Sequence, residues 1–156
     1  MISGIFEMPI TDESYPFSSA ERYCHLSAKD YVEREYRVAG TANVYRPADE
    51  DGGVEVMTAD APYSNRIVVR APKNPAQASG NVVVEIINPT SFMEIERMWI
   101  LGHGEFVRSG DIYVGITSKP NTIAKLKEFN PDRYAFMSWA NPTPERPFNF
   151  DPVDLE

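Results

Sequence analysis

The chain has 156 residues, enough for one domain of ordinary size and too few for two. A hydrophobic fraction of 42% and a charged fraction of 24% are typical of a soluble globular protein and exclude a wholly disordered chain. The net charge of -8 disfavours nucleic acid or an anionic membrane as the main partner, because both need a positively charged face. We therefore predict no nucleic-acid partner and no membrane partner.

Cys24 is the sole cysteine, so the chain can form neither an internal disulfide nor a cysteine-rich metal site. No stretch approaches the roughly 20 apolar residues that cross a bilayer. Residues 1–10 lack the basic and apolar segments of a signal peptide. These features predict a cytoplasmic protein, and no motif predicts a cofactor or a metal ion.

The first half of the chain favours antiparallel strands. Residues 1–30 have scattered prolines and polar residues and predict an irregular N-terminal arm. In residues 31–38, β-prone side chains alternate with charges, which is typical of a half-exposed strand. A turn-rich segment at 47–53 separates two further strand-like segments, so residues 31–58 predict an antiparallel hairpin or meander.

The second half has a different hydrophobic period. Residues 66–69 form a short apolar strand, and residues 81–87 form a nearly continuous apolar run. Such a run is typical of a strand that is covered on both faces, as in a parallel sheet. Residues 111–117 form another apolar strand. Because a helical stretch separates the last two strands, they predict a parallel βαβ unit.

The crossover helix is expected from Phe92 to about Arg108. Ser91 and Glu94 have the spacing of a capping box, which would satisfy backbone groups at the helix start. Gly110 stands where a helix commonly ends in a left-handed residue. The fold class that follows is α/β, with antiparallel strands first and the parallel unit after them.

The domain organisation predicted in this way has three parts. They are the arm at 1–30, an α/β portion at 31–134 that ends with a short helix at 122–129, and an aromatic, proline-rich tail at 135–156. One crossover helix leaves such a sheet poorly covered. The chain therefore resembles the front portion of a larger α/β domain, and the tail's aromatic side chains suggest missing cover or a partner chain.

Motifs for nucleophilic catalysis are missing from the sequence. No Gly-x-Ser-x-Gly occurs, and the histidines are His25, in the arm, and His103, in the middle of the predicted helix. A lone histidine in a helix is usually a packed or surface side chain. No set of residues in the chain makes a convincing catalytic triad.

Glu85 interrupts an otherwise apolar strand, and a buried carboxylate without a partner costs several kcal/mol. We favour an ion pair with Arg66 or Arg70 on a neighbouring strand. The alternative is a pocket carboxylate with a shifted pKa, because Glu85 lies near the carboxyl end of its strand.

The segment Asn88–Ser91 follows a predicted parallel strand and precedes the predicted helix. Ligands of open α/β sheets bind at that position, where backbone N–H groups favour negative charge. Pro89 lacks an N–H, so the candidate donors are Thr90, Ser91 and Phe92. An ordinary turn with a serine cap remains equally compatible with the sequence.

A succession of short motifs, spread over about residues 30–142, resembles a known family. They are Tyr31-Val-Glu-Arg-Glu-Tyr36, Gly40-Thr-Ala-Asn-Val-Tyr45, Thr58-Ala-Asp-Ala-Pro-Tyr63, Asn81-Val-Val-Val-Glu85 with Asn88, Arg108-Ser-Gly110 with Tyr113-Val-Gly115, and Phe129-Asn-Pro-Asp-Arg-Tyr134. Together they resemble an alpha/beta hydrolase domain family. The resemblance implies an α/β-hydrolase sheet and serine-hydrolase chemistry on an ester-like or amide-like bond.

In that family the nucleophile follows the stretch that corresponds to residues 134–142, and the acid and the histidine come later still. The resemblance therefore implies that only the oxyanion-side loop, with Asn88, Thr90 and Ser91, lies in this sequence. We expect an N-terminal fragment of a serine hydrolase that is inactive by itself. The intact protein would act on a small ester-like substrate.

Two alternatives belong to other functional classes. In the first, the chain is a non-catalytic binding or assembly module, and its open sheet edge docks a partner chain. In the second, residues 31–69 form a small β-rich domain that binds a ligand.

Overall fold

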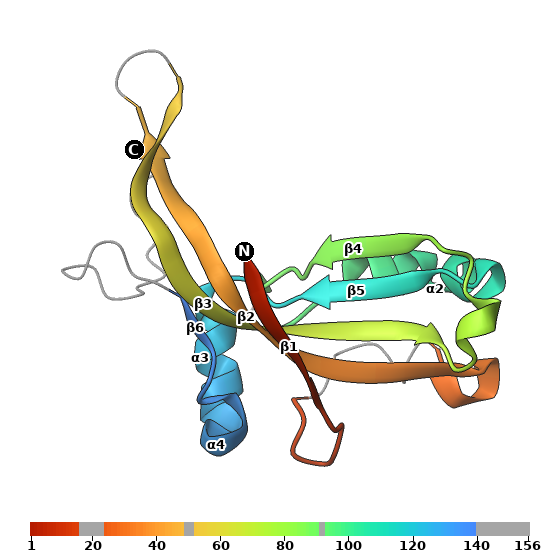
Figure 1. Cartoon of the computed structure of the whole chain (residues 1–156). Helices are drawn as coiled ribbons and strands as arrows, with labels where there is room; N and C mark the ends of the chain where they lie inside the picture. The colour runs from red at the N-terminus through yellow and green to blue at the C-terminus, as the bar shows by residue number, and fades with distance from the viewer. Residues whose placement is uncertain (16–23, 49–51, 91–92, 140–156) are drawn as a thin grey trace.

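The computed structural model describes residues 1–15, 24–48, 52–90 and 93–139 (Figure 1). Its strands are β1 (Ile2–Met8), β2 (Tyr31–Pro47), β3 (Val54–Pro72), β4 (Val82–Ile86), β5 (Ile112–Ile116) and β6 (Ser138–Trp139). Its α-helices are α2 (Arg97–Ser109), α3 (Pro120–Phe129) and α4 (Pro131–Tyr134). Two short 3-10 helices, η1 (Leu26–Lys29) and η2 (Pro75–Gln77), complete the regular structure of this part of the chain. Among these helices none is long and apolar enough to span a bilayer.

One mixed sheet organises the fold, with the strand order β1-β2-β3-β5-β4 and with β6 paired to β3. β4 and β5 are parallel, in the register Val82↔Ile112 to Ile86↔Ile116, and α2 connects them. The other neighbouring strands are antiparallel. The predicted α/β class and the predicted βαβ unit are therefore confirmed. β5 lies between β3 and β4, which leaves β4 at the edge of the sheet.

β2 and β3 form one long antiparallel hairpin that joins residues 31–47 to residues 54–72. The hairpin is predicted correctly, but its second strand is much longer than expected and contains the segment at 66–69. Register shifts between Ala42 and Tyr45 interrupt the ladder. Beyond them, the turn end of the hairpin projects away from the rest of the molecule (Figure 1).

The prediction of an irregular arm is wrong for Ile2–Met8. These residues form β1, which pairs antiparallel with β2 from Ile2↔Gly40 to Met8↔Glu35. β1 has little apolar alternation, because most of its side chains are exposed at the sheet edge. Backbone pairing with β2 decides its conformation, and pairing of that kind leaves no pattern in a single sequence.

α2 begins at Arg97, five residues later than predicted, and its N-cap residue Glu96 makes no side-chain capping bond. The capping-box prediction for Glu94 is wrong, because the Glu94 side chain is buried against Arg66. Glu94 and Glu96 both contact arginines of β3. Side chains two residues apart point to the same side only where the chain is extended. Because Glu94 and Glu96 both point to these arginines, the chain stays extended between them and α2 begins later than predicted. The helix ends as predicted, at Gly110 with a φ of 76°.

The two faces of the sheet differ in their cover. Trp99 and Phe106 of α2 pack with Tyr113 of β5 in one buried cluster on one face, which we call the covered face. The opposite face, called the open face below, consists of β-branched aliphatic side chains at alternate positions of three strands. They are Ile67, Val69, Val82, Val84, Ile86, Ile112, Val114 and Ile116. Val84 and Ile86 are 58% and 72% exposed, respectively.

A second buried cluster joins α3 and α4 to the chain that follows them. Ile123, Leu126, Tyr134 and Met137 form it. Tyr134, the last residue of the predicted α/β portion, is fully buried. Phe148 and Phe150 of the predicted tail lie outside the described residues.

Candidate functional site

The candidate site lies where β4 and β5 end. Because the two strands are parallel, their carboxyl ends share one edge of the sheet. The chain leaves β4 through Asn88 and returns at Ile95, and the two residues exchange backbone hydrogen bonds of 3.3 and 3.0 Å. This pair closes the base of the predicted oxyanion-side loop and fixes the position of Asn88.

The Asn88 side chain is held in one orientation. Its Oδ1 accepts a hydrogen bond of 2.9 Å from the Thr90 N–H and a second from the Thr90 hydroxyl. A backbone N–H requires an acceptor, so these contacts assign Oδ1 and Nδ2 without ambiguity. Nδ2 donates no hydrogen bond to any described residue. Asn88 therefore presents an amide donor at this edge of the sheet.

The other donors predicted in this loop differ from expectation. The Thr90 N–H is already bonded to Asn88. Ser91 and Phe92 lie outside the described residues. Since α2 begins only at Arg97, the described part of the loop does not stand at a helix N-terminus. Of the three predicted site residues in the loop, Asn88 and Thr90 come together, and Asn88 carries the available donor.

Sequence analysis missed the polar segment that follows β5. The Ser118 hydroxyl donates to the Ile87 carbonyl at 2.6 Å, and the Asn121 amide lies 3.5 Å from the Pro89 carbonyl. Between them, Lys119 has a φ of 64° and a ψ of 137°. A side chain other than glycine rarely adopts such a backbone conformation, and strain of this kind gathers at functional sites.

A signal for this segment was present in the sequence. The segment Thr117-Ser-Lys-Pro-Asn-Thr122 is polar and follows an apolar strand that is parallel to β4. Parallel neighbours place their following loops side by side, so this segment had to meet Asn88. Thr122 is buried, and its hydroxyl has no partner among the described residues.

Glu85 does not pair with Arg66 or Arg70, so the favoured prediction is wrong. Both of its carboxylate oxygens accept the Met98 N–H at 3.1 Å, and one accepts the Tyr113 hydroxyl at 2.6 Å. Met98 is in the first turn of α2, where free N–H groups favour an anion. Glu85 is therefore a buried anchor between β4 and α2. Burial and the hydrogen bond to Glu85 raise the pKa of Tyr113.

Arg66 contacts two buried glutamates from different elements. It binds Glu35 of β2 and Glu94, and Glu94 also accepts from the Thr117 hydroxyl at 2.5 Å. Burial raises the pKa of Glu35, but Arg66 and Arg133 outweigh burial and hold that pKa below its usual value. For Glu94, burial prevails over Arg66 and raises the pKa. Arg66 thereby fixes the return of the candidate loop onto the sheet.

Arg70 holds the next turn of the chain in the same way. It donates to Glu33 of β2 at 2.6 Å and to Glu96 at 2.8 Å, and its guanidinium lies 4.6 Å from the Trp99 ring centroid. Arg70 is fully buried. Glutamates on both sides and an aromatic face beneath compensate for the cost of burying the charge.

His103 contacts the backbone of its own helix. Its Nδ1 lies 3.1 Å from the Trp99 carbonyl oxygen and 3.3 Å from that of Ile100, which suits an Nδ1–H donor. This is the arrangement of a packed helix side chain, as the sequence analysis favoured. The described residues hold no arrangement of this histidine with a nucleophile.

A model of the alpha/beta hydrolase domain family matches residues 6–154 of the chain. No curated protein and no solved structure matches the chain.

Proposed function

The chain belongs to the alpha/beta hydrolase domain family, and on this premise we propose that it forms the N-terminal portion of a serine hydrolase. The intact enzyme cleaves an ester or amide bond. A serine oxygen attacks the acyl carbon while a histidine takes the serine proton. The ester or amide bond then breaks, and the alcohol or amine leaves with that proton. Water finally hydrolyses the acyl-serine, which releases the acid and restores the serine. The match over residues 6–154 is the observation that carries this proposal.

In this proposal the three catalytic side chains come from outside the 156 residues. The sequence contains no Gly-x-Ser-x-Gly, and neither of its histidines stands beside a serine in a recognisable motif. We accordingly expect the 156-residue chain to be inactive by itself.

The part that we assign to this chain is the oxyanion side of the active site. Asn88 lies at the carboxyl end of a parallel strand, and its Nδ2 is a donor that Thr90 holds in place. Asparagine side chains are among the groups that stabilise the oxyanion of acyl transfer, and loss of one donor costs roughly 10²–10³ in kcat. The strained Lys119 and the Asn121 contact support a functional role for the same edge.

Labelling of the intact protein with a fluorophosphonate tests the catalytic assignment. We expect the reagent to modify one serine outside residues 1–156 and to abolish hydrolysis of p-nitrophenyl esters. Labelling of a serine within residues 1–156, or an intact protein that neither reacts nor hydrolyses, would overturn the proposal.

Substitution in the intact protein tests the oxyanion assignment. Asn88→Ala should lower kcat by about 10²-fold or more at nearly constant KM, because the donor acts on the transition state. Asn74→Ala is the matched control, because Asn74 also accepts a backbone N–H through its Oδ1 but precedes β4, whereas Asn88 follows it. Equal activity of the two variants would remove Asn88 from the mechanism.

A second candidate function is assembly, and the open face favours it. Val82, Val84 and Ile86 are all more than half exposed, and β4 is an edge strand. In this role the chain docks a partner chain that completes the sheet. Light scattering discriminates the two cases: a stable, monodisperse oligomer without fluorophosphonate reactivity favours assembly, and a reactive longer polypeptide favours the hydrolase.

A further inference from the structure

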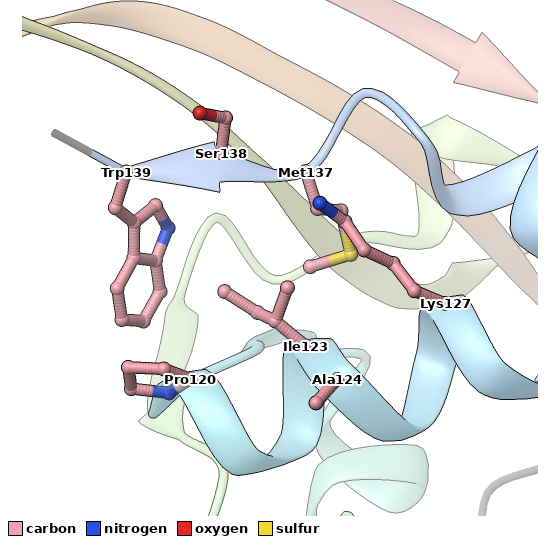
Figure 2. Close-up of a pocket in the computed structure, with 7 residues that line it drawn as sticks. All are labelled: Pro120, Ile123, Ala124, Lys127, Met137, Ser138 and Trp139. Carbon is pink, nitrogen blue, oxygen red and sulfur yellow. The ribbon is translucent and has the colours of Figure 1, made fainter. Parts of the chain in front are cut away.

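A small pocket lies between α3 and β6, next to the segment that follows β5. Its volume is about 310 Å³. The lining is largely apolar and comes from both elements (Figure 2): Pro120, Ile123, Ala124, Met137 and Trp139, with Ser138 and Lys127 as polar members. The volume is at the lower end of the range of about 300–1,000 Å³ that is typical of small-molecule sites.

The floor of this pocket belongs to a buried cluster. Met137 is fully buried and Ile123 is 9% exposed, and both belong to the cluster that they form with Leu126 and Tyr134. The Trp139 indole points toward the Pro120 ring and closes one end (Figure 2). A flat aromatic ring and a proline ring opposite each other suit an apolar body of limited thickness.

Lys127 gives the pocket its charge. Among the described residues that line the pocket it is the one charged side chain, and it extends from α3 toward β6 (Figure 2). Its ammonium group forms no ion pair with any described residue, whereas Lys125 on the same helix binds Glu128 at 2.6 Å. In a protein with a net charge of -8, a lysine that lies beside an apolar pocket and pairs with no described carboxylate is a complementary group for an anion.

The small number of donors at the pocket indicates which class of anion it can bind. One ammonium group matches a single negative charge, whereas the Ser138 hydroxyl points away from Trp139 and Ile123 and offers no donor to the interior of the pocket (Figure 2). Phosphate and sulfate esters are usually bound by several donors, above all by bidentate arginines or helix N–H groups. Here the first residue of α3 is Pro120, which has no N–H.

We propose that this pocket binds a monocarboxylate with an apolar body, such as a medium-chain fatty acid or an aryl-substituted short acid. The carboxylate lies against Lys127, and the apolar body lies between Trp139 and Ile123. The proposal concerns binding alone and does not depend on serine-hydrolase chemistry.

Isothermal titration of the purified protein with octanoate tests this site. We expect one saturable site, and we expect Lys127→Met to weaken it at least about tenfold, because the charge-assisted hydrogen bond is lost. Lys125→Met removes the same charge two residues away and should leave the affinity unchanged. Octanamide, which has the same body without the charge, should bind the unmodified protein no better than octanoate binds the Lys127→Met variant.

A second variant tests whether the ligand occupies the pocket itself. Ala124→Leu fills the pocket from an exposed helix position that should tolerate the larger side chain, and it should abolish the saturable site. Binding that survives Ala124→Leu but is lost in Val84→Asp would place the fatty acid on the open face and overturn the proposal. Equal effects of Lys125→Met and Lys127→Met, or no saturable binding at millimolar octanoate, would overturn it as well.

Discussion

The covered face and the open face of the sheet have side chains of opposite character. The covered face buries Arg66, Arg70, Glu35 and Glu85 beneath helices, and each of them has hydrogen-bonded partners. The open face consists of valines and isoleucines, and those on β4 are more than half exposed. This reverses the usual distribution, in which charges are solvated and β-branched aliphatic side chains are buried.

The difference shows how each face is stabilised. Removal of one member of a buried charge pair leaves an uncompensated charge, so the covered face depends on the pairs that it already contains. Exposed aliphatic side chains gain nothing until something covers them, at roughly 25 cal/mol for each Å² of apolar surface. The open face is therefore the place where further polypeptide would contribute most to the stability of this fold.

Removal of one buried charge should produce the largest loss of stability. Arg66→Met leaves Glu35 and Glu94 without their shared cation and should lower the free energy of unfolding by about 3–5 kcal/mol. Arg46→Met is the control, because the Arg46–Glu55 pair is exposed and should contribute at most about 1 kcal/mol. Urea denaturation of both variants measures the contrast. Equal losses would mean that the buried network adds nothing.

Neighbouring positions on β4 should respond differently to a new charge. Val83 packs against the covered cluster, and Val84 belongs to the open face. Val83→Asp should cost about 2–4 kcal/mol of unfolding free energy, whereas Val84→Asp should change it by less than about 1 kcal/mol. Denaturation curves at one protein concentration give both values. A large loss for Val84→Asp would show that the open face is already covered in solution.

The hydrogen bond between Tyr113 and Glu85 should contribute a smaller amount. Tyr113→Phe keeps the packing against Trp99 but removes the hydroxyl donor, so it should cost about 1–3 kcal/mol. Tyr45→Phe provides the comparison, because Tyr45 is exposed on the projecting part of the hairpin. If the two changes cost the same, the buried carboxylate does not depend on the phenol.

Acid should weaken the covered face gradually. The folded-state pKa of Glu35 lies below the ordinary value of 4.5 for a glutamate, so its ionisation stabilises the fold above about pH 4.5. That contribution is lost as the pH falls through the lowered folded-state pKa. Thermal melts of the unmodified protein should therefore drop below pH 4.5 more steeply than those of Glu35→Gln. Parallel curves would show that Glu35 does not titrate in this range.

The pattern of apolar residues determined much of the second half of the fold. Continuous apolar runs on either side of a helical stretch are enough to predict the parallel strands β4 and β5, because such runs are typical of parallel sheets, although Val84 and Ile86 are exposed here. Gly110 marked the helix end, because the terminal left-handed residue favours glycine. The position of Asn88 at the edge of the sheet followed from the same pattern.

Only the tertiary structure decided where the charged residues go. A glutamate among β-prone residues predicts an exposed strand, but Glu35 is buried because Arg66 lies diagonally across the hairpin and α4 brings Arg133 to it. Glu94 left its predicted capping position for the same arginine. Such partners are far apart in sequence, and their pairing has no period that a single chain displays. Hydropathy thus specified β4 and β5, while long-range charge pairing selected the face that β2 and β3 bury and the residue at which α2 begins.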